Sequence, residues 1–298
     1  MGGNTGNTGN TGNTGNTGNT GNAGNIGGPG GDWAFADRLN RPFVDDPDLG
    51  TVEVIPKKDR GYPEAAWGAY WFGWRVLTEF VTTLWPGMLT GSAAITVKDP
   101  NIFDSAAEIQ VLLNLARFER ADAMAEISSE KDEFLTYFMG LLSASPHSHP
   151  NTHRVLYAAS QLALFAAMYF KDKYQRQRPA QLCPPLLPPF EAPGHASYPS
   201  GHATQSWLMA KCIGLVFDKA LPAATATILK RYVDALAKRI AYNREIAGFH
   251  YHSDSTEGQT LADDMFAKIK ADLQSAAPNM AKFSDAIVKA KAEWTPAP

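Results

Sequence analysis

The chain has 298 residues, 44% of them hydrophobic and 19% charged, which is enough to bury a sizeable core in one large domain or two small ones. Lys and Arg number 27 against 30 Asp and Glu, so the net charge of −3 leaves no basic excess for a nucleic-acid backbone. The longest apolar run, residues 155–170, is shorter than the roughly 20 residues that span a bilayer, and mean hydropathy is −0.25. We therefore expect a soluble globular protein that has no integral membrane segment and binds no nucleic acid.

An Asn-Thr-Gly triplet repeats six times over residues 4–21 and fades out by Gly27. Glycine falls at every third position, as in collagen, but the repeat holds no proline to stiffen a triple helix. It also has almost no apolar side chains to offset the entropy cost of ordering. We predict a disordered tail over residues 1–30 and a single helical domain over residues 31–298.

The first half of that domain shows helical periodicity. Residues 64–85 predict a helix that ends at Pro86, with Arg75 and Glu79 one turn apart and able to pair. Its expected buried face is formed by Trp67, Tyr70, Trp71, Trp74, Leu77 and Val81. Ser105 and Glu108 have capping-box spacing before the apolar run 109–116, and a further helix is predicted over residues 130–142.

In the second half of the domain, capping residues and prolines mark the ends of the helices more clearly. Asn151 is expected to cap a helix that runs to Tyr174, and Ser200 to cap one through Phe217. Between them, residues 179–199 contain seven prolines, which predicts a long rigid loop without regular structure. Two further helices are predicted, from Pro222 to Ala247 and over residues 257–274. Strand-like alternation is scarce, so the predicted fold class is all-α, a helical bundle with one long proline-rich loop.

Three short clusters carry polar chemistry at the ends of these helices. The first runs from Lys171 to Arg178-Pro179, the second from Tyr198 to His202, and the third joins Arg244, His250 and Asp254. Each alone has an ordinary structural explanation: cations near a helix C-terminus, an N-terminal cap, and a solvated helix face.

Taken together, the clusters predict a site for a tetrahedral anion. Ser200, Gly201 and His202 would open a helix N-terminus, where unpaired N–H groups attract anions. Lys171, Arg178 and Arg244 would add three cations, enough to hold a dianion and to stabilise charge that builds up on its oxygens.

Two histidines complete the expected site. Phosphoryl transfer through a covalent intermediate uses one nucleophile and one acid, and His250 and His202 are available for these roles. Asp254, four residues after His250, can accept the Nδ1 proton and leave Nε2 free to attack. No second carboxylate cluster suggests magnesium, so we expect no cofactor and a metal-independent reaction.

The three motifs resemble a known superfamily signature. Lys171-x6-Arg178-Pro179, Pro199-Ser200-Gly201-His202 and Arg244-x5-His250-x3-Asp254 are similar to the signature of the phosphatidic acid phosphatase type 2/haloperoxidase superfamily. This superfamily includes bacterial class A acid phosphatases, lipid phosphatases and vanadium-dependent haloperoxidases. The resemblance covers residues 150–270 and implies a helical bundle of the acid phosphatase/vanadium haloperoxidase type; residues 1–149 contribute no motif.

The resemblance also implies a role for each motif residue. His250 would be the nucleophile, Asp254 its partner, and His202 the acid that protonates the leaving oxygen and later activates water. Asn243 departs from the pattern, which has serine before the arginine. The phosphate oxygens would be bound by Lys171, Arg178, Ser200, Gly201 and Arg244.

The expected function is therefore hydrolysis of a small phosphorylated substrate through a phosphohistidine. The alternative is a vanadium-dependent haloperoxidase, because vanadate and phosphate are both tetrahedral oxyanions and fit the same residues. His195 supports this alternative, since bromide-oxidising vanadium enzymes carry a histidine at the matching place. A third class, a non-catalytic phosphate-binding module, would not need His250, Asp254 and His202 together.

Several features stay outside this assignment. His147, His149 and His153 lack a fourth ligand at the usual spacing for a metal site, and His252 is expected to point away from the chemistry. Cys183 is expected to be a free thiol, although a bridge to Cys212 is left open. Oligomeric state and natural substrate are also open. No secretory signal is visible, so cytoplasmic is the default location, although soluble relatives in the superfamily are often exported.

Overall fold

The computed structural model describes residues 47–51, 61–90, 94–131 and 133–295. The predicted tail, residues 1–30, lies outside this part of the chain. Every regular element within the described residues is an α-helix or a short 3₁₀ helix, which confirms the all-α class. No helix among them is long and apolar enough to cross a membrane.

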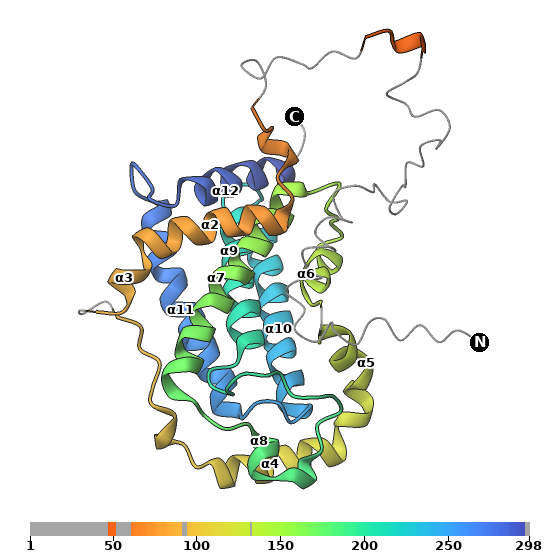
Figure 1. Ribbon diagram of the computed structural model, residues 1–298, viewed down its shortest axis with the longest axis vertical. Helices are drawn as coiled ribbons and strands as arrows, with labels where there is room; N and C mark the ends of the chain where they lie inside the picture. Colours follow the sequence, from red (N-terminus) through yellow and green to blue (C-terminus); the bar gives the residue numbers. More distant parts are fainter. Residues whose placement is uncertain (1–46, 52–60, 91–93, 132, 296–298) are drawn as a thin grey trace.

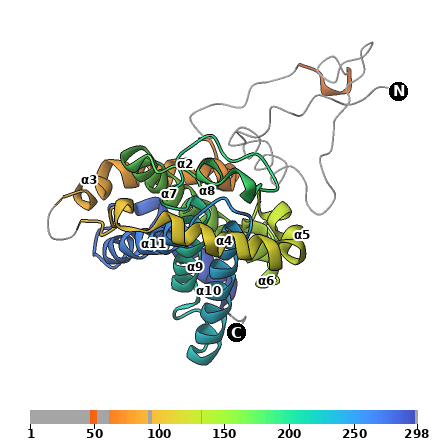
Figure 2. The ribbon, with the colours of Figure 1, turned by 90° about the horizontal axis from the view of Figure 1, so that it is seen from below.

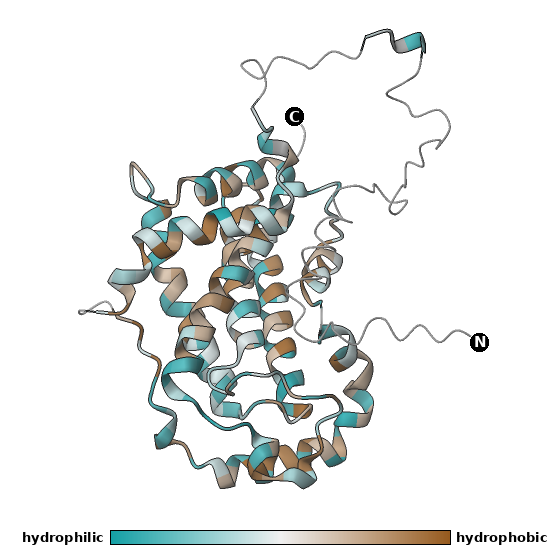
Figure 3. Cartoon of the chain, viewed as in Figure 1, coloured by the Kyte–Doolittle hydropathy of each residue, from teal (hydrophilic) through white to brown (hydrophobic). Residues whose placement is uncertain are grey.

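Four long helices form the centre of the bundle. One of them, α9 (Gly201–Phe217), packs against the other three, and most of its residues are buried. The four helices are α7 (Pro150–Tyr174), α9 (Gly201–Phe217), α10 (Ala223–Ile246) and α11 (His252–Leu273). In Figure 3, hydrophobic and hydrophilic positions alternate along α7 and α10, as expected for helices with one buried face.

The remaining helices cover the two ends of this centre (Figure 1). At one end, α2 (Ala69–Thr83) and α12 (Ala281–Trp294) lie across α7, and the short α3 (Trp85–Met88) follows α2. At the opposite end, Figure 2 shows α4 crossing the bundle beside α5. The elements of that end and its flank are α4 (Ser105–Phe118), α5 (Arg120–Glu130), α6 (Leu135–Leu141) and α8 (Pro179–Leu182).

The ends of α9 and α10 follow the predicted punctuation. Ser200 caps α9 and accepts a hydrogen bond from the Ala203 amide at 3.4 Å. Gly248 follows α10 with φ +80°, a conformation that favours glycine. A Cβ on Gly258 of α11 would lie 2.9 Å from the Ser200 carbonyl oxygen. Glycine there lets α11 approach the first turn of α9, which brings the second and third motifs together.

The proline-rich segment is more ordered than predicted. Within residues 179–199, Pro179–Leu182 forms α8 and Pro184–Leu186 forms a 3₁₀ turn. In both, proline occupies the first helical position, where its missing N–H has no helical partner to lose. The prediction of no regular structure is therefore wrong for these two turns. Leu186 anchors the segment by packing with Ile109, Leu112 and Tyr251.

The predicted buried face of α2 is confirmed at Tyr70, which is buried, but it is wrong at two tryptophans. Trp71 and Trp74 are 48% and 49% exposed, whereas Phe72, Val76 and Phe80 are buried. The helix carries apolar residues on several sides, so periodicity alone does not select the face that packs. Close packing against α7 selects the buried face, since a Cβ on Gly73 would clash with Oε1 of Gln161.

The predicted ion pair on α2 is also wrong. Arg75 pairs with Glu64 at 2.9 Å, and Glu79 pairs with Lys282 at 2.8 Å, on α12. Both pairs connect different elements, and they replace a contact between neighbours on one helix. The predicted helix over residues 64–85 is divided into a 3₁₀ turn, α2 and α3, with Pro86 inside α3.

Three other helix predictions need correction. Asp104, not Ser105, caps α4, because its Oδ1 accepts from the amides of Ala106 and Ala107 at 3.0 Å. The helix predicted over residues 130–142 is replaced by α5, which ends at Glu130, and by the shorter α6. The last predicted helix begins at His252, and α12 follows it without having been predicted. Both cysteines are free thiols, Cys183 half-buried and Cys212 buried.

Candidate functional site

The three motifs meet at one cavity of about 370 Å³, where α9 begins and α10 ends. Each motif contributes to its wall, since Arg178, His202, Arg244 and His250 all line it. The other lining residues are Lys131, Glu191, Ala192, Pro193, Gly194 and Phe249. Two imidazoles and two guanidinium groups, from segments up to 72 residues apart, therefore face one space.

His250 lies in the short connection between α10 and α11. Its Nδ1 is 3.0 Å from Oδ2 of Asp254, so the expected contact between them is present. That oxygen also accepts from Ser197 Oγ and from the Tyr251 amide. Because the carboxylate holds the hydrogen on Nδ1, Nε2 is the nitrogen left to act in the cavity.

The environment of His250 favours a neutral ring. Burial, followed by the positive charges of Lys171 and Arg178, lowers the pKa of His250 well below its usual value. A neutral imidazole keeps the lone pair on Nε2 that a nucleophile or a metal ligand needs. The same charges favour an anion beside it.

His202 is the second residue of α9 and lies on another side of the cavity. Its Nε2 is 3.1 Å from the backbone oxygen of Glu130, and its ring lies 4.9 Å from the ring of Phe134. Since a carbonyl only accepts, Nε2 carries the hydrogen, and Nδ1 is the basic nitrogen. Burial, then Arg244, lowers the pKa of His202 well below its usual value.

Arg178 is fixed by the proline-rich loop and by the α10–α11 connection. Its Nε donates to the His195 carbonyl at 3.1 Å, and Nη1 donates to the Phe249 carbonyl at 3.0 Å. Its Nη2 and the Ala196 carbonyl oxygen each lie 3.1 Å from His195 Nδ1. Burial lowers the pKa of Arg178 to about 10, so the group stays charged at neutral pH.

His195 therefore lies behind Arg178 and does not line the cavity. Burial, then the charge of Lys171, lowers the pKa of His195 to about 4. The ring is therefore neutral at ordinary pH, and its own backbone carbonyl accepts from Arg178 Nε. His195 thus orients an arginine of the cavity.

Lys171 belongs to the last turn of α7 and is almost fully buried. Its Nζ donates to the carbonyls of Ala196 and Ser197 at 2.8 and 2.7 Å, so two of its three N–H groups hold the loop. It is not among the lining residues of the cavity. Burial, then Arg178, lowers the pKa of Lys171 well below its usual value.

Ser200 and Gly201 occupy the N-terminus of α9 and are buried. The Ser200 amide donates to the Asp254 backbone oxygen at 2.9 Å, which ties the second motif to the third. A Cβ on Gly201 would have only Gln205 nearby, at 3.9 Å. Neither residue lines the cavity.

Arg244, at the end of α10, has an unusual set of partners. Its Nη2 donates to the Ile127 carbonyl at 3.0 Å and lies 3.4 Å from Oε2 of Glu130. Its Nε is buried and has no hydrogen-bond partner among the described residues. A buried donor without a partner costs about 1–3 kcal/mol, and an anion in the cavity can relieve that cost.

Glu130, at the end of α5, was not predicted from the sequence. It is 1% exposed, and burial raises its pKa to about 7 despite the opposing charge of Arg244. Asn243 Nδ2 donates to both of its carboxyl oxygens, at 3.0 and 3.1 Å. Asn243, which departs from the signature that the motifs resemble, thus donates hydrogen bonds to this buried carboxyl group.

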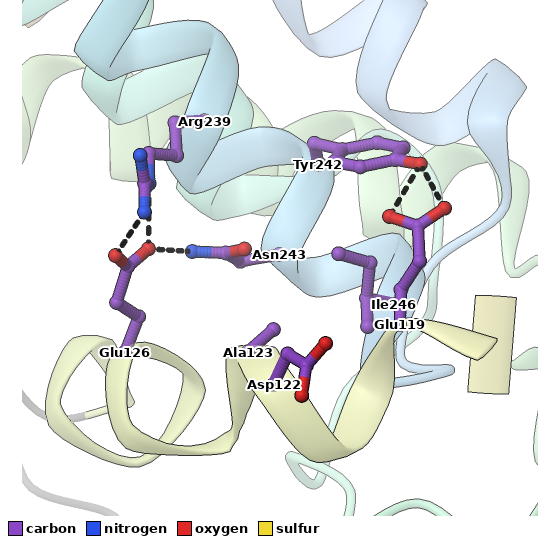
Figure 4. A pocket seen from close by; sticks show the side chains of 8 residues that line it. All are labelled: Glu119, Asp122, Ala123, Glu126, Arg239, Tyr242, Asn243 and Ile246. Atoms are coloured by element: carbon purple, nitrogen blue, oxygen red, sulfur yellow. Dashed lines mark hydrogen bonds and ion pairs between the residues drawn. The ribbon is translucent and has the colours of Figure 1, made fainter. Parts of the chain in front are cut away.

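Asn243 also borders a second cleft of about 400 Å³ between α5 and α10 (Figure 4). Two of its three carboxylates are paired with neighbours: Tyr242 donates to Glu119 at 3.0 Å, and Arg239 Nε donates to Glu126 at 2.7 Å. Figure 4 shows Arg239 and Asn243 directed at the same oxygen of Glu126. None of the sequence-predicted site residues lines this cleft.

Arg176 is the second residue that sequence reasoning missed. It lies between Lys171 and Arg178, and its guanidinium bonds Asp254 at 2.8 Å and Glu108 at 2.9 Å. The available signal was an arginine two residues before Arg178. Glu108 instead resembled part of a helix cap, so its role beside α11 was not visible.

The remaining histidines lie elsewhere. His252 has a 72% exposed side chain and pairs with Glu245 at 3.1 Å, so it points away from the cavity as predicted. The ring of His149 lies 4.6 Å from that of Trp294 in a tilted arrangement, and His153 contacts the ring of Tyr157. Across the described parts of the chain, no three His, Cys, Asp or Glu side chains are arranged to hold a metal ion.

Comparison with known proteins adds no identification. No model of a protein family matches this sequence, and no curated protein matches it. The function is therefore inferred from the residues of the cavity and from their geometry.

Proposed function

We propose that the protein is a metal-independent phosphomonoester hydrolase of the phosphatidic acid phosphatase type 2/haloperoxidase type, acting through a phosphohistidine on His250. The observation that carries the proposal is the shared cavity. In it, an aspartate-bound histidine faces the same space as a buried arginine whose Nε has no partner among the described residues. This combination supplies a nucleophile and a binding group for an anion.

The charges near the cavity support a phosphorylated substrate. Among the described residues, three cations, Lys131, Arg178 and Arg244, line it together with a single carboxylate, that of Glu191, and Lys171 acts on it through its field on His250. Asp254 and Glu130 are buried behind these residues and are already bonded to protein donors. The cavity thus offers donors and positive charge to a tetrahedral dianion, which suits phosphate oxygens.

The first chemical step is attack by His250 Nε2 on phosphorus. A P–N bond forms as the P–O bond to the leaving group breaks, while Asp254 stabilises the positive charge on the imidazole. His202 donates a proton from Nδ1 to the leaving oxygen. Its Nε2–H stays on the Glu130 carbonyl throughout and keeps the ring in position.

The second step returns the enzyme to its starting state. Water attacks phosphorus, His202 Nδ1 accepts its proton, and the P–N bond breaks to release inorganic phosphate. Because the pKa of His202 is lowered, its ring becomes protonated only when a bound dianion stabilises the charged form. Substrate and proton therefore bind together. The proton on His202 is lost as pH rises, so activity on substrates with basic leaving groups should be highest on the acid side.

A vanadium-dependent haloperoxidase is the second candidate, and one observation favours it. His195 buttresses Arg178, at the position where the resemblance places a histidine of bromide-oxidising enzymes. The residues fit vanadate for the reasons that they fit phosphate: His250 Nε2 and the Nε of Arg244 would hold it. Bound vanadate would supply the centre at which peroxide oxidises a halide.

Two assays on one preparation test these functions. We expect release of p-nitrophenol from p-nitrophenyl phosphate in the presence of EDTA, with loss of turnover in His250→Ala. Bromination of monochlorodimedone after addition of vanadate and peroxide, with negligible phosphatase turnover, would favour the haloperoxidase. Saturable phosphate binding with neither activity would overturn both in favour of a binding module.

A further inference from the structure

Arg176 lies beyond the cavity, directly behind the His250–Asp254 pair. It follows the C-cap of α7, where Gln175 adopts φ +50°, and this turn directs the chain back towards α11. Its side chain is only 8% exposed. It is not a lining residue of the cavity, so it has no direct route to a bound substrate.

The guanidinium of Arg176 connects the buried carboxylate of Asp254 with the half-buried carboxylate of Glu108. Its Nη1 donates to Asp254 Oδ1 at 2.8 Å and to Ser253 Oγ at 2.7 Å. Its Nη2 donates to Glu108 Oε2 at 2.9 Å and to Ser105 Oγ at 3.0 Å. The face of the guanidinium lies 3.8 Å from the centroid of the Tyr251 ring.

These contacts leave Asp254 no freedom to rotate. Arg176 holds Oδ1, while Oδ2 receives His250 Nδ1, Ser197 Oγ and the Tyr251 amide. The Arg176 backbone carbonyl accepts from the Ser197 amide at 2.9 Å, so one residue also positions the serine that bonds Oδ2. Burial raises the pKa of Asp254, and Arg176 opposes that rise more than any other neighbour.

Glu108 fixes the far side of Arg176. Its Oε1 accepts from the Ser253 amide at 2.6 Å, and its Oε2 accepts from Ser253 Oγ at 2.8 Å. A carboxylate at this point also interacts favourably with the N-terminal end of the α11 dipole. The end of α7, the first turn of α4 and the start of α11 are thereby joined by one guanidinium.

We propose that Arg176 is a positioning residue for the reaction at His250, extending the pair to a chain His250–Asp254–Arg176–Glu108. This inference rests on the proposed function. Arg176 holds the aspartate carboxylate in one orientation, and the aspartate in turn holds His250 with Nε2 directed at the cavity. Two carboxylates bonded by separate nitrogens of one planar group require an arginine, because a lysine ammonium reaches only one of them in this geometry.

The test is a double-mutant cycle with Arg176→Lys and Asp254→Asn. Lysine keeps the charge and the carbon stem, so it limits the risk of unfolding, which a thermal melt of each variant monitors. We expect Arg176→Lys alone to lower kcat roughly 100-fold, as small misplacements of reacting groups do, with KM little changed. In the Asp254→Asn background the same change should lower kcat less than about 3-fold, because the carboxylate it positions is absent.

The pH profile separates positioning from general packing. Arg176→Lys keeps a positive charge but loses the guanidinium hydrogen bond to Asp254 Oδ1, and without that bond the carboxylate should take up a proton at higher pH. The acid limb of kcat/KM should therefore move upwards in Arg176→Lys. Arg75→Lys is the matched control, since it makes the same change in the Arg75–Glu64 pair on α2. We expect it to leave kcat, KM and the pH profile unchanged.

A readout without turnover distinguishes failure of this inference from failure of the proposed function. In the ¹⁵N spectrum of histidine-labelled protein, wild-type His250 should be neutral with its hydrogen on Nδ1. Arg176→Lys and Asp254→Asn should both shift it towards the Nε2–H form. Equal losses of kcat in the two backgrounds, or an unchanged His250 tautomer in Arg176→Lys, would overturn the role of Arg176 whatever reaction the wild type catalyses.

Discussion

The two histidines of the cavity are held in different ways. Behind His250 stand a buried carboxylate and an arginine, whereas His202 is held by the backbone oxygen of Glu130 and the ring of Phe134. A carboxylate stabilises positive charge on an imidazole, but a carbonyl and an aromatic ring mainly orient it. His250 is therefore suited to become a charged phosphohistidine, and His202 to exchange a proton that the bound anion controls.

Replacing His250, the histidine that has a carboxylate partner, should have the largest effect. We expect His250→Ala to abolish phosphatase turnover, because no other imidazole nitrogen in the cavity has a carboxylate partner among the described residues. Steady-state release of p-nitrophenol measures the loss. His252→Ala is the control, since the His252 side chain is 72% exposed and lies outside the cavity. Substantial turnover in His250→Ala would remove it from the nucleophile role.

Changing the partner of His250 should rank next. Asp254→Asn keeps the size of the side chain but removes the charge that fixes the His250 tautomer, so kcat should fall by about 10³- to 10⁴-fold. Pre-steady-state measurement of the first turnover should show the same fall, because phosphorylation itself is slowed. A loss below 10-fold would show that His250 does not need this carboxylate.

Replacing His202, the histidine held by neutral groups, should lower activity by an amount that depends on the leaving group of the substrate. His202→Ala should lower kcat/KM about 10²- to 10⁴-fold for an alkyl phosphate, and far less for p-nitrophenyl phosphate, whose leaving oxygen needs no proton. In the wild type, kcat/KM for the alkyl substrate should fall as pH rises, because the lowered pKa of His202 disfavours its protonated form. Equal losses on both substrates would argue against an acid role.

Glu130 should have the smallest effect, seen in the pH dependence of anion affinity. Burial raises its pKa to about 7, so the carboxyl ionises as pH rises through neutrality and then competes with a bound anion for Arg244. Sulfate stays a dianion across this range, and its inhibition constant should rise between pH 6 and 8 by roughly 10-fold more in wild type than in Glu130→Gln. The other groups bonded to or charged near this carboxyl are Asn243, Glu126 and Arg239.

Identical pH profiles for sulfate inhibition in wild type and Glu130→Gln would contradict this role of Glu130. Such a result would leave His202 and His250 as the groups that couple anion binding to protons. Asp234→Asn is a suitable control, because it also removes a carboxyl whose pKa is raised by burial, without lining the cavity.

The helix ends and the motif residues of this site could be predicted from the sequence, because they depend on local backbone chemistry and on spacing along the chain. Ser200 and Gly248 mark helix ends through local backbone chemistry, and the spacing of His250 and Asp254 places them one turn apart. These contacts are encoded within a few residues. The motif spacing also predicted that distant segments would meet, and Arg178, His202, Arg244 and His250 do line one cavity.

The partners behind the motifs could not be predicted in this way. Glu108 comes from α4 and Glu130 from α5, and their contacts with Arg176 and Arg244 depend on how those helices pack against the motif-bearing ones. Glu108 also fitted a local capping pattern, and Asp104 performs that function instead. The exposure of Trp71 and Trp74 on α2 was mispredicted for the same reason, because several apolar faces compete and tertiary packing selects one.

Trapping the phosphoenzyme tests the central claim most directly. Phosphohistidine survives base and is lost in acid, so wild-type protein mixed with ³²P-labelled substrate and quenched in alkali should retain label on the peptide that carries His250. His202→Ala, which leaves the nucleophile in place, should still be labelled by an activated aryl phosphate, and His250→Ala should not. Hydrolysis without any base-stable label, or with label on another residue, would contradict the account.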